Sequence, residues 1–247
     1  YVLEHQPESI ARFPKGLRRY VSLMADNDKL DESIFLRNVL SKKGKWYTPK
    51  NFTKSAPGSK YHYSNIGATL AAYVIENAVG ISYEDFTREN IFKPLTMSAT
   101  GWDATDVPII HHAKRYFDAS TVIPDYYLIT RADGALMTST TDFGKFLTEM
   151  IKGYHGKGTL LDAKSYKTMF TGEKIGNRSS GIFWAINGSG NPNHSGSDPG
   201  VLTIASINPQ RNLGVFFMSN LDMENNKKIR KTIIKILNSI KRHQWKV

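Results

Sequence analysis

The spacing of the apolar residues changes character near residue 170, and this change limits the folds open to the chain. Before it, apolar residues recur at helical spacing, which predicts helices over 31–40, 66–79, 82–93, 142–152 and 162–170. After it, short segments rich in Ile, Val, Phe and Trp predict antiparallel strands over 181–186, 201–207 and 213–219. We therefore expect an α+β fold with a mainly helical region, residues 1–170, and an antiparallel sheet region, residues 171–247.

A final amphipathic helix is predicted over residues 225–240. Its apolar side chains share one face and its lysines lie opposite; the apolar residues are Ile229, Ile233, Ile236, Leu237 and Ile240. The favoured interpretation is a helix that covers one face of the sheet. The alternative is a basic helix that lies on a membrane surface.

Composition excludes several classes of protein. The chain has 247 residues, 40% of them hydrophobic and 22% charged, which is ordinary globular usage and argues against disorder, collagen and coiled coil. No apolar run is long enough to span a membrane. Cysteine is absent, so disulfides, thiolate metal sites and a cysteine nucleophile are excluded. The adjacent pair His111-His112 cannot face one metal ion together, and no metal or cofactor is expected.

The formal net charge of +11 favours anionic surroundings such as nucleic acid, anionic lipid or an acidic cell-envelope polymer. The simpler interpretation is a solvated basic surface. Tyr61, Tyr63 and nearby lysines could stack on bases, but no nucleic-acid motif accompanies them, so nucleic acid is not an expected partner. The expected partners are therefore a small-molecule or peptide substrate and an anionic cell-envelope polymer.

Two short motifs stand out from this background. Tyr63-Ser64-Asn65 follows Pro57-Gly58 and precedes the helix predicted over 66–79, and His194-Ser195-Gly196 precedes Ser197-Asp198-Pro199-Gly200 at the entry to a strand. Alone, the first could be an aromatic residue beside a helix cap, and the second a turn at a strand end. Their order gives them weight, because Ser82-Tyr-Glu-Asp-Phe86 and Ile91-Phe-Lys-Pro-Leu95 lie between them.

This ordered set resembles the serine β-lactamase and penicillin-binding protein superfamily, in particular class C β-lactamases, D-Ala-D-Ala carboxypeptidases and related esterases. The resemblance extends from about residue 50 onward. It implies a β-lactamase/transpeptidase-like fold and a serine hydrolase that acts on an amide or ester through an acyl-enzyme. D-amino-acid peptides, β-lactams and simple esters are all implied as substrate classes. The resemblance also implies a periplasmic or extracellular location.

The resemblance assigns roles to the first motif. Tyr63 would exchange a proton with the nucleophile and the leaving group. A free phenol titrates near pH 10, so it needs a neighbouring cation to act near neutrality. Asn65 would bridge a lysine and the substrate amide, because its side chain both donates and accepts hydrogen bonds.

The second motif is assigned roles in the same way. His194 would form the strand-side wall and polarise Tyr63, and Ser195 would bind a substrate carboxylate. Gly196 would let the substrate lie close along the strand. The backbone N–H of Ser197 would contribute to an oxyanion hole.

The family's Ser-x-x-Lys motif is missing, because no serine in the chain is followed by a lysine three positions later. There is also no Gly-x-Ser-x-Gly elbow. We expect the nucleophile and its lysine upstream of Tyr1, which would make this chain the C-terminal portion of the enzyme fold. The alternative is a non-catalytic module that binds a cell-wall peptide or a protein partner.

Overall fold

The computed structural model describes residues 1–176, 178–221 and 227–244. Its main feature is an antiparallel sheet in the order β3-β4-β5-β6-β7-β8. The strands are β3 (Glu173–Ile175), β4 (Arg178–Ser180), β5 (Ala185–Ile186), β6 (Pro192–Asp198), β7 (Val201–Asn208) and β8 (Leu213–Ser219). The strands predicted over 201–207 and 213–219 are confirmed, whereas only the end of the segment 181–186 forms a strand.

Strand β6 differs from the sequence interpretation. The residues around His194 were expected at the entry to a strand, but they form the body of one, paired with β7 from Asn193–Ser206 to Asp198–Val201. The segment Pro-Asn-His-Ser-Gly-Ser-Asp has no apolar alternation, so nothing local marks it as a strand. Pairing with the apolar strand β7 holds it extended.

The helices are α1 (Lys15–Ala25), α2 (Glu32–Leu40), α3 (Asn65–Val79), α4 (Tyr83–Thr87), α5 (Thr140–Tyr154), α6 (Ala163–Phe170) and α7 (Lys227–Gln244). The predicted helices 31–40, 66–79, 142–152 and 162–170 are confirmed as α2, α3, α5 and α6. The helix expected over 82–93 is divided, because α4 is followed by a π-helical turn, Arg88–Phe92. No helix among the described residues is long and apolar enough to cross a membrane.

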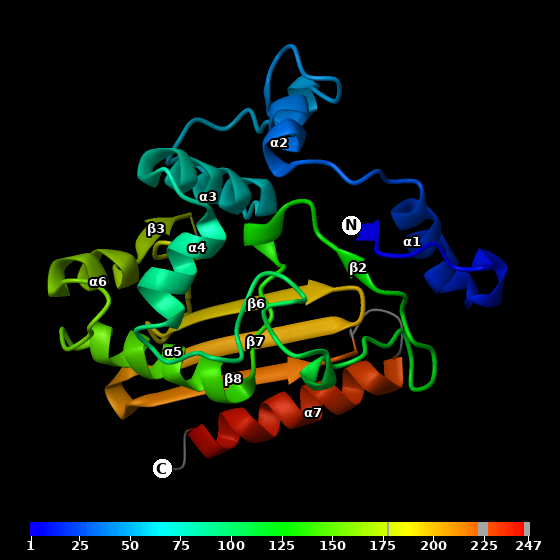
Figure 1. Cartoon of the computed structure of the whole chain (residues 1–247). Coiled ribbons are helices and arrows are strands. Elements are labelled where there is room, and N and C mark those ends of the chain that lie inside the picture. The colour runs from blue at the N-terminus through cyan, green and yellow to red at the C-terminus, as the bar shows by residue number, and fades with distance from the viewer. Residues whose placement is uncertain (177, 222–226, 245–247) are drawn as a thin grey trace.

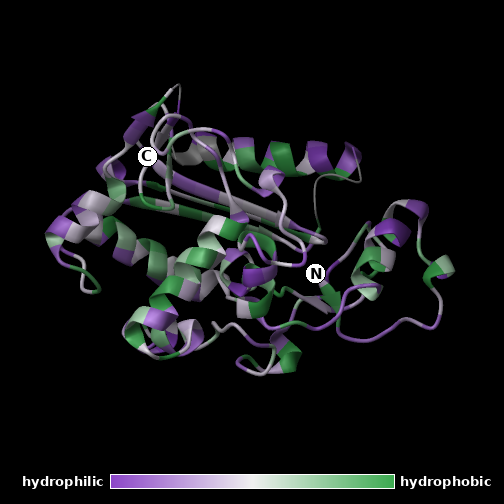
Figure 2. Ribbon diagram, turned by 90° about the horizontal axis from the view of Figure 1, so that it is seen from above, coloured by the Kyte–Doolittle hydropathy of each residue, from purple (hydrophilic) through white to green (hydrophobic). Residues whose placement is uncertain are grey.

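Helices cover both faces of the sheet (Figures 1 and 2). Helix α5 packs on one face, where the ring of Phe143 stacks on Phe216 of β8 with centroids 3.9 Å apart. Helix α7 lies along the other face, with Ile233 buried and Ile236 42% exposed. The expected cover helix is therefore present, and its predicted start at Asn225 lies outside the described residues.

The N-terminal residues build a hydrophobic core that the sequence analysis did not foresee, separate from the core between α5, α6 and the sheet. A two-stranded sheet pairs β1 (Val2–Leu3) with β2 (Tyr126–Tyr127). Helix α1 packs on it through Leu17, Val21 and Met24, which are buried with Ile123. Through this core, the N-terminal residues pack against the segment around Ile123 and Tyr126.

Candidate active site

A large cavity in the described part of the chain lies between helices and the sheet, and residues of the helical part, of strands β6, β7 and β8 and of helix α7 line it. Its volume is about 3230 Å³, several times the roughly 300–1,000 Å³ of an ordinary small-molecule pocket. All six residues singled out from the sequence line it: Tyr63, Asn65, His194, Ser195, Gly196 and Ser197. The structure thus brings the two motifs to one cavity, and it has room for more than a small substrate.

The helix side of the cavity is organised by the start of α3. The backbone N–H of Gly67 donates to the Ser64 hydroxyl oxygen at 3.0 Å, so Ser64 caps the helix. Tyr63 and Asn65 flank this cap, one just before the helix and the other as its first residue. The Tyr63 side chain is 62% exposed, and no hydrogen bond from the cap restrains it. The phenol is therefore free to meet a substrate.

The strand side of the cavity is the second half of β6. Strand β5 pairs with β6 only at Pro192 and Asn193, so within the described residues the other edge of β6 is unpaired from His194 to Asp198. An unpaired strand edge presents backbone N–H and C=O groups to a bound chain. The rings of Tyr63 and His194 lie 6.0 Å apart, centroid to centroid, and join the two sides.

The charges around Tyr63 are acidic. Partial desolvation raises the pKa of the phenol, and the carboxylates of Asp133 and Asp198 raise it further. At neutral pH the hydroxyl is therefore protonated and can donate a hydrogen bond. The cation expected beside it is not among these neighbours.

Asp133 and Asp198 were not foreseen from the sequence, because they come together only in the fold. Asp133 sits on the turn 131–134 and Asp198 at the end of β6, where an Oδ of Asp198 lies against Gly134. The Tyr1 hydroxyl donates to Asp198. Burial raises the pKa of Asp133, and the Asp198 charge adds to the rise, against hydrogen bonds from Thr130 and Thr69.

His194 has the opposite shift. Its side chain opens on the cavity, yet surrounding protein atoms displace part of its water and lower the pKa of the imidazole. The ring is thus neutral at neutral pH, with one nitrogen to donate and one to accept a hydrogen bond. Within the described residues, no group of three His, Asp or Glu side chains is arranged to hold a metal ion.

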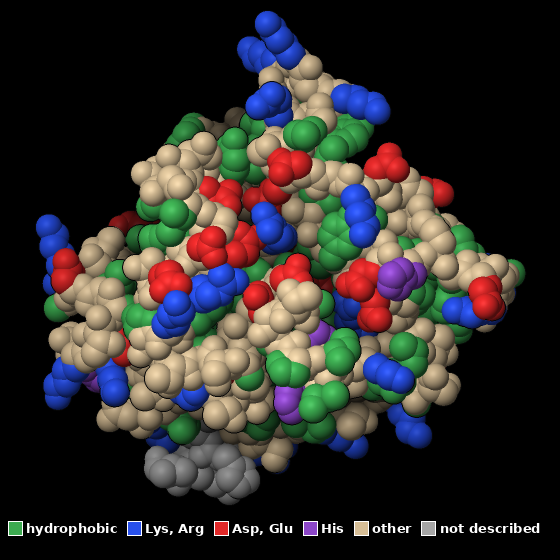
Figure 3. Space-filling view, in the orientation of Figure 1, with side chains coloured by type: hydrophobic (Ala, Val, Ile, Leu, Met, Phe, Trp, Pro, Cys, Tyr) green, Lys and Arg blue, Asp and Glu red, His purple; other side chains and the backbone are tan. Residues whose placement is uncertain are grey.

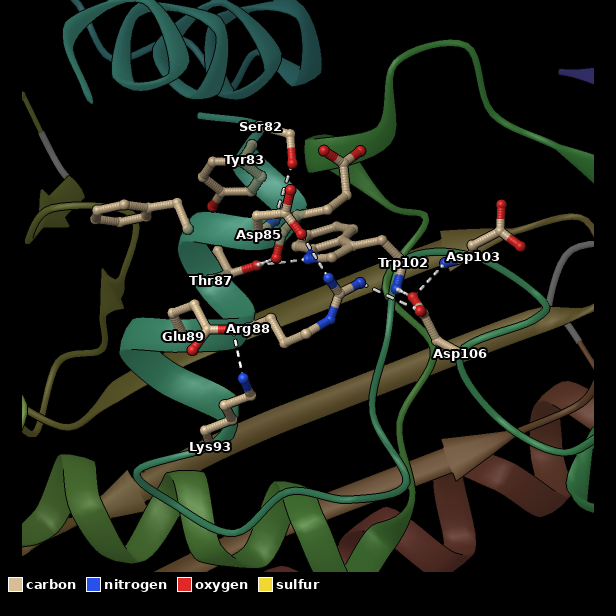
Figure 4. Close-up of polar contacts among 12 residues, drawn as sticks. Ser82, Tyr83, Asp85, Thr87, Arg88, Glu89, Lys93, Trp102, Asp103 and Asp106 are labelled. Carbon is tan, nitrogen blue, oxygen red and sulfur yellow. Dashed lines mark hydrogen bonds and ion pairs between the residues drawn. The ribbon is translucent and has the colours of Figure 1, made fainter. Parts of the chain in front are cut away.

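A polar cluster behind the helix side fixes the loop after α4 (Figure 4). The Arg88 guanidinium donates to Asp85 at 2.6 Å and to Asp106 at 3.2 Å. Asp106 in turn accepts the backbone N–H of Trp102 at 2.9 Å, and the Trp102 indole donates to Thr87 at 2.7 Å. These contacts clamp the loop of residues 102–106 onto α4.

The same side of the molecule holds the turn that carries Asp133. The Arg131 guanidinium pairs with Glu84 of α4. Its backbone N–H donates to Glu32 of α2 at 2.8 Å. Two helices therefore fix the turn, and with it the Asp133 carboxylate that raises the pKa of Tyr63.

Comparison with known proteins identifies the family of the chain. Residues 19–237 match the Beta-lactamase family, so the chain belongs to that family. Among curated proteins, it is 26% identical to Protein flp of Staphylococcus aureus (strain NCTC 8325 / PS 47) over 174 residues, which are 68% of this chain and 35% of that protein. The chain thus spans about a third of the length of this relative.

Solved structures share the fold. D-amino acid amidase from Ochrobactrum anthropi SV3, complexed with D-phenylalanine, superposes with a TM-score of 0.62 at 21% identity, covering 78% of this chain and 62% of that one. A class C beta lactamase from Rhodobacter sphaeroides gives 0.56 at 19% identity, covering 72% and 60%. The α+β, β-lactamase/transpeptidase-like fold expected from the sequence is confirmed.

Proposed function

We propose that this chain forms most of the active site of a serine acyl-transfer hydrolase that cleaves an amide or ester. The observation that carries the proposal is the meeting of Tyr63 and His194 across one cavity that also contains Asn65 and the open edge of β6. Family membership supports the same reaction class. The nucleophilic serine and its lysine would come from a Ser-x-x-Lys motif outside these 247 residues, and the large cavity has room for the segment that carries them.

In the proposed reaction, the serine oxygen bonds to the substrate carbonyl carbon and gives up its proton. The Tyr63 hydroxyl relays that proton to the leaving nitrogen or oxygen as the bond to the carbonyl carbon breaks. Water then hydrolyses the serine ester and restores the hydroxyl. The upstream lysine would offset the carboxylates that raise the pKa of Tyr63.

The remaining site residues would position the substrate. The Asn65 amide would hold the substrate amide, and neutral His194 would accept or donate a hydrogen bond at Tyr63. The Ser197 N–H on β6 would bind the developing oxyanion, a contact worth about 3–4 kcal/mol of barrier. Gly196 and Ser195 would line the path of the substrate along the strand.

The charge of the cavity bears on the substrate class. Asp133 and Asp198 lie near Tyr63, so a substrate that carries an ammonium group near its scissile bond would be attracted and a carboxylate repelled. Amides or esters of amino acids with a free amino group fit this field better than β-lactams, whose carboxylate Ser195 was expected to bind. The structural neighbour D-amino acid amidase was also crystallised with L-phenylalanine amide, which has such an amino group and no carboxylate.

Covalent labelling tests the reaction class. The complete protein would be incubated with a fluorescent penicillin and with an acyl-phosphonate, and the modified peptide located by mass spectrometry. An adduct on the serine of an upstream Ser-x-x-Lys is expected. An adduct on a serine of residues 1–247 would contradict the assignment of the nucleophile.

A non-catalytic binding module is the second candidate function. The acidic groups that raise the pKa of Tyr63 favour it, because they disfavour the phenolate. Reversible binding of a cell-wall peptide without any covalent adduct, in a folded complete protein, would favour this module over the hydrolase.

A further inference from the structure

One long stretch of the sequence carries positive charge alone. Between Glu32 and Glu76 there is no Asp or Glu, although the chain has 22 acidic residues. The same stretch contains seven Lys and Arg residues, namely Arg37, Lys42, Lys43, Lys45, Lys50, Lys54 and Lys60. Much of the net charge of +11 is therefore concentrated in one segment, which the hydrolase chemistry does not use.

The centre of this stretch, residues 41–54, forms an ordered projection that we call the basic tip. Asn38 fixes its first turn, because its side chain and its carbonyl oxygen accept the N–H groups of Lys45 and Trp46 at 3.2 and 3.0 Å. The Asn51 amide donates to the carbonyl oxygens of Val39 and Trp46 at 2.8 and 3.1 Å. A Cβ at Gly44 would lie 2.3 Å from the Asn38 oxygen, so the turn is closely packed.

The basic tip presents aromatic rings beside its lysines. Trp46 is 44% exposed and Phe52 is 49% exposed. Each is held by a partner ring, Trp46 by Phe35 at 5.9 Å and Phe52 by Tyr47 at 6.0 Å between centroids. The Lys45 ammonium lies 5.8 Å from the Trp46 ring centroid. A solvated basic surface would not require exposed aromatic rings. The fixed rings of Trp46 and Phe52 therefore distinguish the basic tip from such a surface.

The basic tip stands away from the rest of the molecule. In Figure 1 it projects beyond α2, on the opposite side of α3 from the sheet. Figure 3 shows Lys and Arg side chains gathered on this projection and acidic side chains below it. None of residues 41–54 lines the active-site cavity, so the tip can contact a partner while the cavity stays open.

We propose that the basic tip docks the protein onto the surface of a membrane that contains anionic phospholipid. Lysines on a projection gain from an anionic leaflet, by about fivefold in partitioning for each lysine within a Debye length. Tryptophan and phenylalanine insert at the boundary between headgroups and acyl chains, where an apolar ring and a polar backbone are both satisfied. A soluble polyanion without apolar or stacking groups, such as polyphosphate, would contact the lysines but not Trp46 and Phe52.

Helix α7 is the other basic amphipathic element, and it is a weaker candidate for this contact. Its central apolar residue Ile233 is 5% exposed, because the helix lies on the sheet. Only the centre of its apolar face is buried, since Ile236 on that face is 42% exposed. Residues 227–244 contain no Trp, Phe or Tyr, however, whereas the basic tip exposes two aromatic rings. The proposal rests on charge and exposure at the tip, and it stands or falls independently of the proposed hydrolase.

Vesicle co-sedimentation with matched variants tests the proposal. The complete protein would be mixed with vesicles of phosphatidylcholine alone, or of phosphatidylcholine with phosphatidylglycerol. The tip variant is Lys42→Glu, Lys43→Glu and Lys45→Glu. The control variant is Lys227→Glu, Lys231→Glu and Lys235→Glu on α7, which changes the net charge by the same amount. All six lysines are exposed, so both variants should fold, as thermal melting would verify.

We expect binding to the anionic vesicles only, a loss of about a hundredfold in the tip variant, and a small loss in the control. Equal losses in both variants would mean that overall charge drives binding and would overturn the proposal. A larger loss in the control would assign the contact to α7 and would overturn it as well. So would failure of the wild type to bind anionic vesicles.

A second variant separates a membrane from a soluble polyanion. Trp46→Ala with Phe52→Ala keeps every charge and removes both exposed rings. We expect this variant to lose at least about tenfold in vesicle binding, since ring burial is lost, while its binding to polyphosphate is unchanged. Unchanged vesicle binding would show that the tip recognises anionic charge alone and would contradict membrane insertion.

Discussion

Tyr63 and the basic tip belong to the same helical part of the chain, yet the charges that act on them differ in sign. The carboxylates of Asp133 and Asp198 line the cavity with Tyr63 and raise its pKa, whereas the tip has lysines and no acidic residue. The difference teaches that a net charge of +11 does not determine the charges that act on Tyr63. An anionic partner and a cationic substrate are compatible because they meet different surfaces.

The largest expected effect is the loss of turnover when the Tyr63 hydroxyl is removed, because this hydroxyl carries the proposed proton transfer. Replacing Tyr63 by Phe in the complete protein should lower turnover by about 10²–10⁴-fold with little change in substrate binding, because proton transfer is lost. Tyr61→Phe is the matched control, since Tyr61 lines the same cavity and its ring lies 5.5 Å from the Arg178 guanidinium. Steady-state kinetics of both variants would decide. An equal loss of turnover in Tyr63→Phe and Tyr61→Phe would mean that Tyr63 has only a structural role.

The carboxylates of Asp133 and Asp198 should control which substrates are preferred. Asp133→Asn or Asp198→Asn should lower kcat/KM for an amino-acid amide by about tenfold and leave an uncharged ester nearly unaffected. In the wild type, the preference for the cationic substrate should be lost as pH falls through the pKa of Asp133. That loss should begin above the usual carboxylate range, because this pKa is raised. A preference that survives both substitutions would contradict the assignment.

His194 should give a smaller, pH-dependent effect. Its pKa is lowered, so the neutral ring persists to lower pH than a free histidine, and activity that needs it should fall only below about pH 6.5. His194→Asn should remove this acidic limb from the profile of kcat/KM. The profile of the complete protein against pH checks this, and a limb that the variant retains would belong to another group.

The smallest expected effect is a loss of stability from a substitution in the basic tip, with no change in activity. Gly44→Ala places a Cβ against the Asn38 carbonyl oxygen and should cost about 1–3 kcal/mol in unfolding free energy. Hydrolysis measured well below the melting temperature should be unchanged, because the tip does not line the cavity. Denaturant unfolding would measure the loss of stability, and steady-state rates would measure hydrolysis. A loss of turnover in a fully folded variant would show that the two regions are coupled.

The sequence predicted those parts of the fold that apolar periodicity determines. Helix α5 and strands β7 and β8 were predicted because their apolar residues repeat with the period of their element. Helix α1 was missed, although Leu17, Val21 and Met24 recur at helical spacing and could have indicated it. Strand β6 could not be found in this way, because its polar residues are extended only through pairing with β7.

The candidate site was predicted only in part for a similar reason. Tyr63, Asn65 and His194 belong to short motifs whose order is visible in the sequence. Asp133 and Asp198 belong to no such motif, and they approach Tyr63 through the turn 131–134 and the end of β6. Tertiary structure alone places them there, so neither the motifs nor the composition of the chain indicates these two carboxylates.

A double-mutant cycle on Tyr63 and His194 tests the central claim most directly. Single-turnover acylation rates would be measured for the complete protein, for Tyr63→Phe, for His194→Asn and for the double variant. If the two rings serve one proton transfer across the cavity, the double variant should lose about as much as Tyr63→Phe alone. If the losses simply multiply, the two side chains act independently and the shared site proposed for them is wrong.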